Sequence, residues 1–251
     1  YLHSFPTRRS SDLFIGDARQ RIREDHLRIL RYFRFQARFG SQPADKEAEQ
    51  SCSELAPTLK GLSRERIGME MLNLLGLPDP APTVARMAEL GVLAVILPEA
   101  DPQRLAKLVT AEQRHAIAPD AVRRLAALLP AEVPMAEAVA SRFRLSGVQK
   151  KRLALAARRD GQADEARALA YRLGRESALD RLLVEGGDPS PLQGWDIPVF
   201  PLKGGDIVAA GITAGPQVAR VLQAVEARWV DEGFPDADRV RVLLADEITP
   251  T

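Results

Sequence analysis

The stretch Arg23–Gly40 has the sequence REDHLRILRYFRFQARFG, which combines five arginines and two acids with four aromatic residues. A surface helix needs few aromatics, and a core helix cannot bury that many guanidinium groups without partners. At about 100° per residue, the apolar members fall on one side of a helix and the charged members on the other. We therefore predict one helix from Asp17 to Gly40 with a buried stripe and a charged face.

The charged face of this helix contains the residues from which the functional interpretation starts. Glu24 and Asp25 have the spacing at which a carboxylate can pair with Arg28, and Arg31 follows one turn later. Taken by itself, such a face is typical of an ordinary solvated, salt-bridged helix. The order of the residue types along the chain favours a functional interpretation.

The aromatic residues of the same helix are interpreted mainly as packing residues. At helical spacing, we expect Phe33, Phe35 and Phe39 to belong to the core. Stacking on a nucleobase is kept open only for Tyr32 or Phe35.

Composition limits the class of protein. The 251 residues are 27% charged with a net charge of +1, so total charge does not decide for or against a nucleic-acid partner. Ala, Leu and Arg dominate, which predicts a mostly helical chain. Cys52 is the only cysteine; this excludes a disulfide framework and indicates a reducing cytoplasm. The strongest apolar run, Gly91–Leu97, is far too short to span a membrane.

The first thirteen residues, YLHSFPTRRSSDL, show no periodicity and do not lead into the helix that follows. A back-translation of Leu2 to Leu13 resembles a widely used sequencing-adapter oligonucleotide. We therefore interpret residues 1–13 as a non-native scar, with a disordered basic arm as the alternative, and exclude them from the fold prediction. The corresponding expectation is that the native chain continues upstream of Phe14.

Proline-rich joints divide the remaining chain into three predicted domains. The joints are LGLPDPAP at residues 75–82 and PSPLQGWDIPVFP at residues 189–201. The predicted domains are residues 14–77, 78–188 and 189–251, forming an elongated, all-α array of helices. Predicted helices beyond residue 80 lie near 82–91, 102–113, 119–129, 133–144, 147–159, 162–173, 174–185 and 237–247. Residues 202–234 are predicted to form a helix that Gly211 ends, a glycine turn, and a longer helix that starts at Gly215–Gln217.

Three motifs follow one another in fixed order near the start of the chain. They are E-D-x-x-R-x-x-R from Glu24, R-F-x-A-R-x-G from Arg34, and S-x-E-R-I-x-x-E from Ser63. Their order and spacing resemble those of class II tRNA nucleotidyltransferases (CCA-adding enzymes) and bacterial poly(A) polymerases. Gly205 to Pro216 also resembles the family's C-terminal G-x-D-h-x-x-x-G-x-x-x-G-P segment, where h is hydrophobic. The resemblance covers roughly residues 14–245 and is thin between about 80 and 195.

The resemblance implies a neck, body and tail for the three predicted domains, and a role for the first motif. Asp25 and Arg28 would bind the Watson–Crick edge of incoming CTP or ATP. Glu24, Arg31, Glu65 and Arg66 would support them, the last two by pairing with charges of the first helix. For Arg31, contact with a phosphate is the alternative. His26 is interpreted as incidental and Cys52 as a packing residue.

The implied reaction is the addition of CCA to tRNA 3′ ends. It needs Mg²⁺ held by paired carboxylates, and the chain contains no D-x-D after a G-G-x-x-R turn. We therefore expect the catalytic α/β head and its Mg²⁺ ligands to lie outside this chain, and the chain alone to be inactive.

Basic clusters after residue 120 are candidates for RNA contact. They are Arg123-Arg124, Arg142 with Arg144, Lys150-Lys151-Arg152 and Arg158-Arg159. A basic stripe attracts phosphates without regard to sequence, although a solvated helix surface is an equal alternative. Since the implied partner is tRNA, we predict RNA contact at Lys150, Lys151, Arg158 and Arg159.

Two other functions stay open at this stage. A poly(A) polymerase of the same family has the same motifs, and a helical RNA-binding or protein-interaction module without enzymatic activity would have the same fold class. The sequence does not define the oligomeric state.

Overall fold

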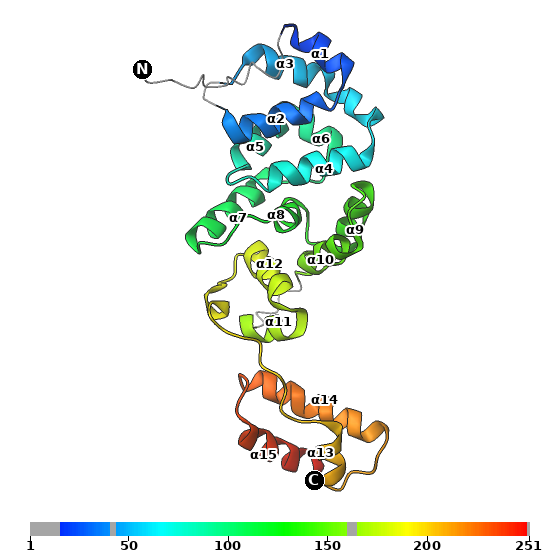
Figure 1. The fold of residues 1–251 in the computed structure, drawn as a ribbon, viewed down its shortest axis with the longest axis vertical. Helices are drawn as coiled ribbons and strands as arrows, with labels where there is room; N and C mark the ends of the chain where they lie inside the picture. The colour runs from blue at the N-terminus through cyan, green and yellow to red at the C-terminus, as the bar shows by residue number, and fades with distance from the viewer. Residues whose placement is uncertain (1–15, 41–43, 160–164, 250–251) are drawn as a thin grey trace, which may run out of the picture. The chain divides into compact units, whose positions relative to one another are not determined.

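A computed structural model describes residues 16–40, 44–159 and 165–249. The predicted scar at residues 1–13 lies outside the described residues. In the described part, the chain forms fifteen α-helices and two short 3-10 helices, and no strand (Figure 1). The prediction of an all-α fold is therefore confirmed.

The chain divides into two compact units. Unit 1 comprises Tyr1–Gln162 and Asp180–Asp188, and unit 2 comprises Ala163–Leu179 and Pro189–Thr251. Helices of unit 1 are α1 (Ala18–Glu24), α2 (Arg28–Phe39), α3 (Lys46–Leu55), η2 (Ala56–Gly61), α4 (Arg64–Leu75), α5 (Ala81–Glu89), α6 (Val92–Ile96), α7 (Pro102–Arg114), α8 (Ala121–Leu128), α9 (Val133–Arg142) and α10 (Gly147–Ala157). The remaining helices are α11 (Ala166–Leu173), α12 (Arg175–Glu185), η3 (Ser190–Leu192), α13 (Gly204–Ala209), α14 (Pro216–Asp231) and α15 (Ala237–Ile248). The functional names neck, body and tail stay predictions.

The single helix predicted from Asp17 to Gly40 is wrong. The chain leaves the helix at Asp25, which has an extended backbone (φ −150°, ψ 103°), and α2 begins at Arg28. Asp25 Oδ1 accepts a hydrogen bond from the backbone N–H of Leu27 at 3.1 Å. An aspartate that binds the backbone two residues ahead competes with the helical hydrogen bonds, which explains the corner.

Beyond residue 80, the described helices agree with the predicted ones within a few residues, and residues 162–164 of the predicted helix 162–173 lie outside the described residues. The exception is α6, which forms from part of the apolar Gly91–Leu97 run. Gly91 precedes it with a left-handed backbone (φ 73°), a conformation that a side chain disfavours. One face of this short helix is buried, because Val92, Leu93 and Ile96 lie within about 100° of one another around its axis, and Ala94 on the other side is exposed.

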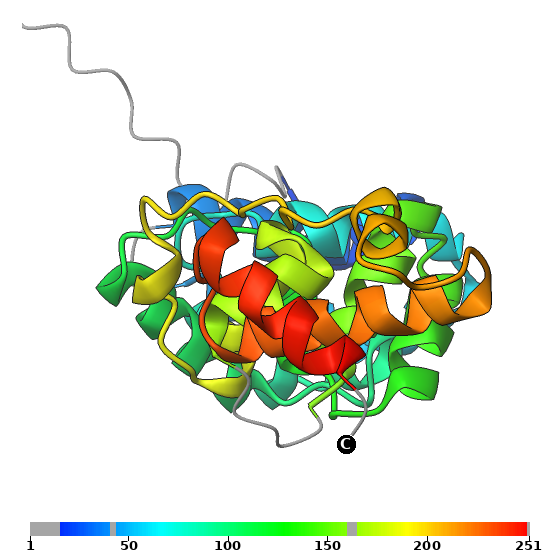
Figure 2. The same ribbon diagram turned by 90° about the horizontal axis from the view of Figure 1, so that it is seen from below.

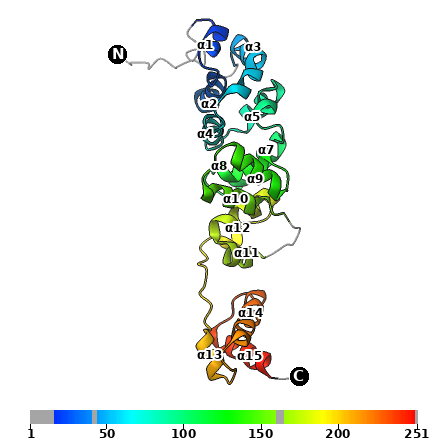
Figure 3. The same ribbon diagram turned by 90° about the vertical axis from the view of Figure 1, so that its right-hand side faces the viewer.

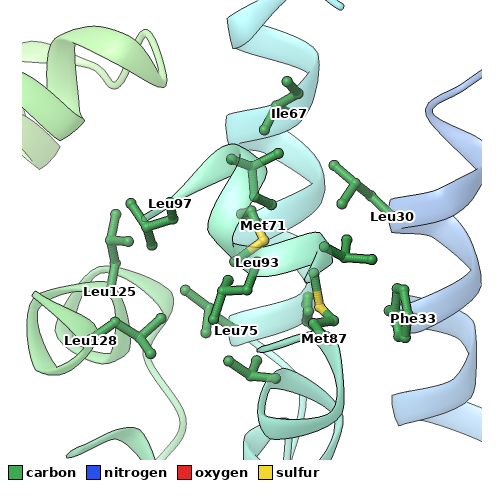
Figure 4. Packing of buried hydrophobic residues seen from close by; sticks show 14 of the residues in the cluster. Leu30, Phe33, Ile67, Met71, Leu75, Met87, Leu93, Leu97, Leu125 and Leu128 are labelled. Atoms are coloured by element: carbon green, nitrogen blue, oxygen red, sulfur yellow. The ribbon is translucent and has the colours of Figure 1, made fainter. Parts of the chain in front are cut away.

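One apolar core runs through unit 1. Figure 4 shows Leu30 and Phe33 of α2 directed toward Met71 of α4 and Met87 of α5. On the other side of α4, Leu125 and Leu128 of α8 belong to the same core. The helix α1 packs beside α3 (Figure 3). Within α4, a Cβ at Gly68 would lie 2.5 Å from the carbonyl oxygen of Phe143, so only glycine permits this approach.

Unit 2 has a smaller, aromatic core. The helix α15 lies across α14 (Figure 2), and Val240, Leu243 and Leu244 of α15 are buried there. Trp229 of α14 is 2% exposed, lies edge-on to Tyr171 at a ring-centroid distance of 5.4 Å, and donates to the carbonyl oxygen of Pro235. A buried tryptophan with its N–H satisfied fixes both elements at this point.

Candidate functional site

Asp25 lies at the corner between α1 and α2, where three groups hold its carboxylate. Beside the Leu27 N–H, Arg66 Nη2 of α4 lies 3.3 Å from both carboxylate oxygens. Arg31 Nη1 lies 3.8 Å from Oδ2. The side chain is 27% exposed, so the carboxylate is oriented by its partners and still reaches the surface.

Arg28 is held by a different set of groups. Its Nη1 donates to Glu24 Oε2 at 2.7 Å and to the carbonyl oxygen of Arg21 at 2.7 Å. The hydrogen bond from Arg28 lowers the pKa of Glu24, which keeps that carboxylate ionised. The predicted Glu24–Arg28 ion pair is therefore present. Arg28 contacts Asp25 through its backbone N–H, 3.0 Å from the Asp25 carbonyl oxygen, and its side chain is 29% exposed.

Glu70 of α4 is a member of this site that sequence reasoning did not assign. Its side chain is 9% exposed, and it accepts from Arg31 Nε at 3.2 Å and from Arg34 Nε at 2.8 Å. Glu70 is one turn after Arg66 on α4, so the same face of that helix presents a cation to Asp25 and an anion to two arginines of α2. The sequence contains a signal for this role, because Glu70 is the last residue of the third motif and lies four residues after Arg66, which places both on one face of a helix.

The predicted supporting residues are therefore only partly brought together. Arg66 pairs with a charge of the first motif, as expected, and Arg31 joins Asp25 to Glu70. Glu65 is exposed, and within the described ranges it forms no ion pair, so the predicted pairing of Glu65 is wrong. The arrangement is an alternating chain of charges, Arg66–Asp25–Arg31–Glu70–Arg34, which carries one excess positive charge.

Most of the basic clusters after residue 120 have structural partners instead of an open surface. Arg123 and Arg124 are 4% and 1% exposed and pair with Glu112, and Arg123 also pairs with Asp180. Arg124 donates further to the carbonyl oxygen of Leu75 at the end of α4. For this cluster the expectation of a phosphate-binding surface is wrong, because burial excludes a ligand.

Two further arginines of these clusters are also engaged. Arg152 pairs with both Asp120 and Asp180, and Arg142 pairs with Glu99 at 2.6 Å. Asp180, with no exposed surface, thus joins α8, α10 and α12 in one buried ion network. Removing a single partner from a buried ionic group of this kind strongly lowers the stability of the fold.

The four predicted RNA contacts differ in their surroundings. Arg159 is half-buried, donates to the carbonyl oxygens of Ala126 and Leu129, and has its pKa lowered by burial and by nearby Arg104. Lys150, Lys151 and Arg158 instead line a groove of about 400 Å³ between α9 and α10. The other lining residues of the groove are Val133, Glu137, Gly147, Ala154 and Leu155. Three cations facing one acid make this groove a candidate site for anions.

Comparison with known proteins finds sequences and structures that are similar to this chain. Residues 44–104 match the family model described as "Probable RNA and SrmB- binding site of polymerase A". The chain is 28% identical to mouse mitochondrial CCA tRNA nucleotidyltransferase 1 over 247 residues, which is 88% of this chain and 55% of the mouse protein. It is also 40% identical to the Geobacillus stearothermophilus CCA-adding enzyme over 82 residues. These residues make up 33% of this chain and 20% of that enzyme.

In sequence, the chain is similar to CCA-adding enzymes and, over residues 44–104, to polymerase A. It spans about half the length of the mouse, zebrafish and human relatives that it matches.

The fold agrees with that of solved CCA-adding enzymes. The Bacillus stearothermophilus enzyme in complex with CTP aligns with a TM-score of 0.65 at 23% identity, over 92% of this chain and 64% of that enzyme. The Thermotoga maritima enzyme complexed with tRNA aligns with a TM-score of 0.63 at 16% identity, over 91% of this chain and 62% of that enzyme. At these identities the likeness concerns the fold.

The described residues offer neither a membrane-spanning helix nor a metal site. No helix in the described ranges combines the length and the apolarity needed to cross a membrane. No three His, Cys, Asp or Glu side chains in the same ranges are placed to hold a metal ion.

Proposed function

We propose that this chain is the base-selecting and RNA-binding part of a nucleotidyltransferase that adds CCA to tRNA 3′ ends from CTP and ATP, in the cytoplasm. The observation that carries the proposal is the placement of the first motif. Asp25 and Arg28 lie on the two sides of one corner, partly exposed, and each is oriented by its own partners. The proposal is supported by the mouse CCA tRNA nucleotidyltransferase, which is 28% identical to this chain over 88% of the chain's length.

The chemistry of base selection follows from the two side chains. Asp25 carries a carboxylate with about four lone-pair positions, so it can accept from a nucleobase amine while keeping its protein donors. Cytosine and adenine carry that exocyclic amine, whereas uracil and guanine place a carbonyl oxygen there, which a carboxylate repels. Arg28 can donate to ring nitrogen and carbonyl acceptors of the same edge. This pair therefore favours CTP and ATP over UTP and GTP.

Nucleotide recognition requires a rearrangement of Arg28. Its guanidinium is bound to Glu24 and to the Arg21 carbonyl oxygen, on the α1 side of the corner. A guanidinium has five N–H donors, so Glu24 can retain one hydrogen bond while other donors turn to a base. Glu24 then orients Arg28, and Arg66 orients Asp25.

The proposed RNA contact is the α9–α10 groove. Lys150 and Lys151 lie in the first half of α10, and Arg158 directly follows its last residue, Ala157, roughly 12 Å further along the helix axis. Such a row of cations binds the phosphate backbone independently of sequence. Arg159 is not among the proposed contacts, because its guanidinium binds the carbonyl groups at the end of α8.

The test of base selection is nucleotide binding by the chain. We expect saturation-transfer NMR or equilibrium dialysis to show tighter binding of CTP and ATP than of UTP and GTP. The variant Asp25→Asn provides an amide that can donate to a carbonyl oxygen, so it should lose the preference by roughly tenfold or more. Glu89→Gln, which alters an exposed ion pair with Arg86 on α5, is the matched control. An unchanged preference in Asp25→Asn would contradict the proposal.

Poly(A) polymerase activity is the second candidate, and the matched family model, named for polymerase A, favours it. The two activities differ in the use of CTP. When the enzyme that carries this chain is given a trimmed tRNA and CTP alone, a CCA-adding enzyme incorporates cytidine and a poly(A) polymerase does not.

A further inference from the structure

The C-terminal end of α2 exposes an aromatic residue that the sequence places in the core. Phe39 is 55% exposed, whereas Phe33 on the same helix is 1% exposed. Tyr32, one of the two residues at which the sequence leaves base stacking open, is fully buried, so the stacking expectation is wrong for Tyr32. In the structure, Phe39 is therefore the large exposed aromatic residue of α2.

The neighbours of Phe39 hold its ring in place. Phe35, one turn earlier, lies at a ring-centroid distance of 5.0 Å with the planes tilted by 52°. The guanidinium carbon of Arg38 lies 5.1 Å from the centroid of the Phe39 ring. A ring fixed by an aromatic and a cationic neighbour loses little freedom when a planar ligand stacks on it.

The charges around this ring indicate what the ligand must carry. Arg31, Arg34 and Arg38 follow one another on the exposed side of α2, and two of them share the single carboxylate of Glu70. Arg38 has no carboxylate partner within the described residues. An aromatic surface beside unneutralised guanidinium groups suits a planar ring attached to an anion, which is the chemistry of a nucleotide.

We propose that Phe39, together with Arg38, is a stacking platform for an unpaired nucleobase of RNA bound to unit 1. The proposal rests on the proposed RNA-binding function and adds a residue to it. Phe39 lies two turns beyond Arg31, about 12 Å along α2 from the residue that joins Asp25 to Glu70. The base-selecting corner lies at the other end of α2, about 16 Å along the helix axis from Phe39. The unpaired 3′ end of an RNA can extend over this distance.

The experiment places a tryptophan at the platform. The chain with Phe39→Trp is titrated with a dye-labelled RNA minihelix that has two unpaired 3′ nucleotides, and with the same minihelix in which both are abasic. Stacking should quench the tryptophan fluorescence with the first RNA and not with the second. In the otherwise unaltered chain, Phe39→Leu should weaken binding of the first RNA about tenfold and leave the affinity for the abasic RNA unchanged.

Controls separate the failure of this proposal from the failure of RNA binding. Val148→Trp, at an exposed position of α10 in the same unit, should show no base-dependent quenching. Dye anisotropy reports binding independently of stacking. If both RNAs bind and quench Phe39→Trp equally, or not at all, the platform is refuted while RNA binding stands. If neither RNA binds, both are refuted, and capture of an apolar peptide at this ring would then be the property to examine.

Discussion

Arg66 Nη2 lies 3.3 Å from both carboxylate oxygens of Asp25, forty-one residues earlier in the chain. This ion pair joins α4 to the corner between α1 and α2. It fixes the direction in which the Asp25 carboxylate can accept a further hydrogen bond. The third motif of the chain thereby contacts the first, and under the proposed function Arg66 positions the carboxylate that selects the base.

Removing Arg66 should therefore disturb selectivity before it disturbs folding. We expect Arg66→Met to reduce the ratio of CTP to UTP affinity several-fold, because an unrestrained Asp25 carboxylate can rotate away from the amine. Arg66→Lys should restore part of the ratio. Arg64→Met, an exposed arginine on the same helix, is the control, and equal losses in both Met variants would argue against positioning.

The α9–α10 groove predicts a particular salt dependence. Replacing Lys151 or Arg158 by Gln should weaken tRNA binding for all sequences and reduce the slope of log K against log salt by about 0.7–0.9 for each phosphate that the variant no longer neutralises. Filter binding between 50 and 200 mM salt, roughly the range over which this term is large, measures it. Lys107→Gln on α7 is expected to leave the slope unchanged. A slope that is unaltered in Lys151→Gln and Arg158→Gln would exclude the groove as an RNA-binding surface.

The buried ion network predicts a large loss of stability at one position. Asp180→Asn leaves Arg123 and Arg152 without their shared carboxylate in a region closed to water. We expect the free energy of unfolding to fall by about 3–5 kcal/mol, as is usual when one member of a buried ion pair is removed. Urea unfolding followed by circular dichroism provides the measurement. Glu89→Gln, in the exposed ion pair with Arg86 on α5, should cost less than about 1 kcal/mol.

Tyr171 predicts a loss of stability at alkaline pH. Burial and the hydrogen bond to Glu226 raise the pKa of Tyr171 from 10.0 to about 12. The folded state then holds a proton that the unfolded state releases, so stability is fully present below pH 10 and falls as the pH rises from 10 to 12. Absorbance titration of tyrosinate should show a transition near 12 that Tyr171→Phe removes. A Tyr171 transition near 10 would contradict the environment described here.

Local pattern was sufficient for much of this fold. The helices from residue 102 onward lie where periodicity, prolines and glycines predict them, because each depends on neighbours within a few positions. The Glu24–Arg28 pair is likewise local, because its members are one helical turn apart. The corner at Asp25 does not follow from the pattern, since helical periodicity continues on both sides of it and a single side-chain hydrogen bond to the backbone decides against the helix.

The sequence by itself determined the helical class, the order of the motifs and the residue types available for the proposed base recognition. Only the tertiary structure decided which arginines remain available to a ligand. Arg123, Arg124 and Arg152 look as basic in the sequence as Lys151 and Arg158, yet they are bound to carboxylates brought in from other helices. The physical reason is that a charge is neutralised by its nearest opposite charge in space. The local sequence pattern does not show which residue far along the chain becomes that partner.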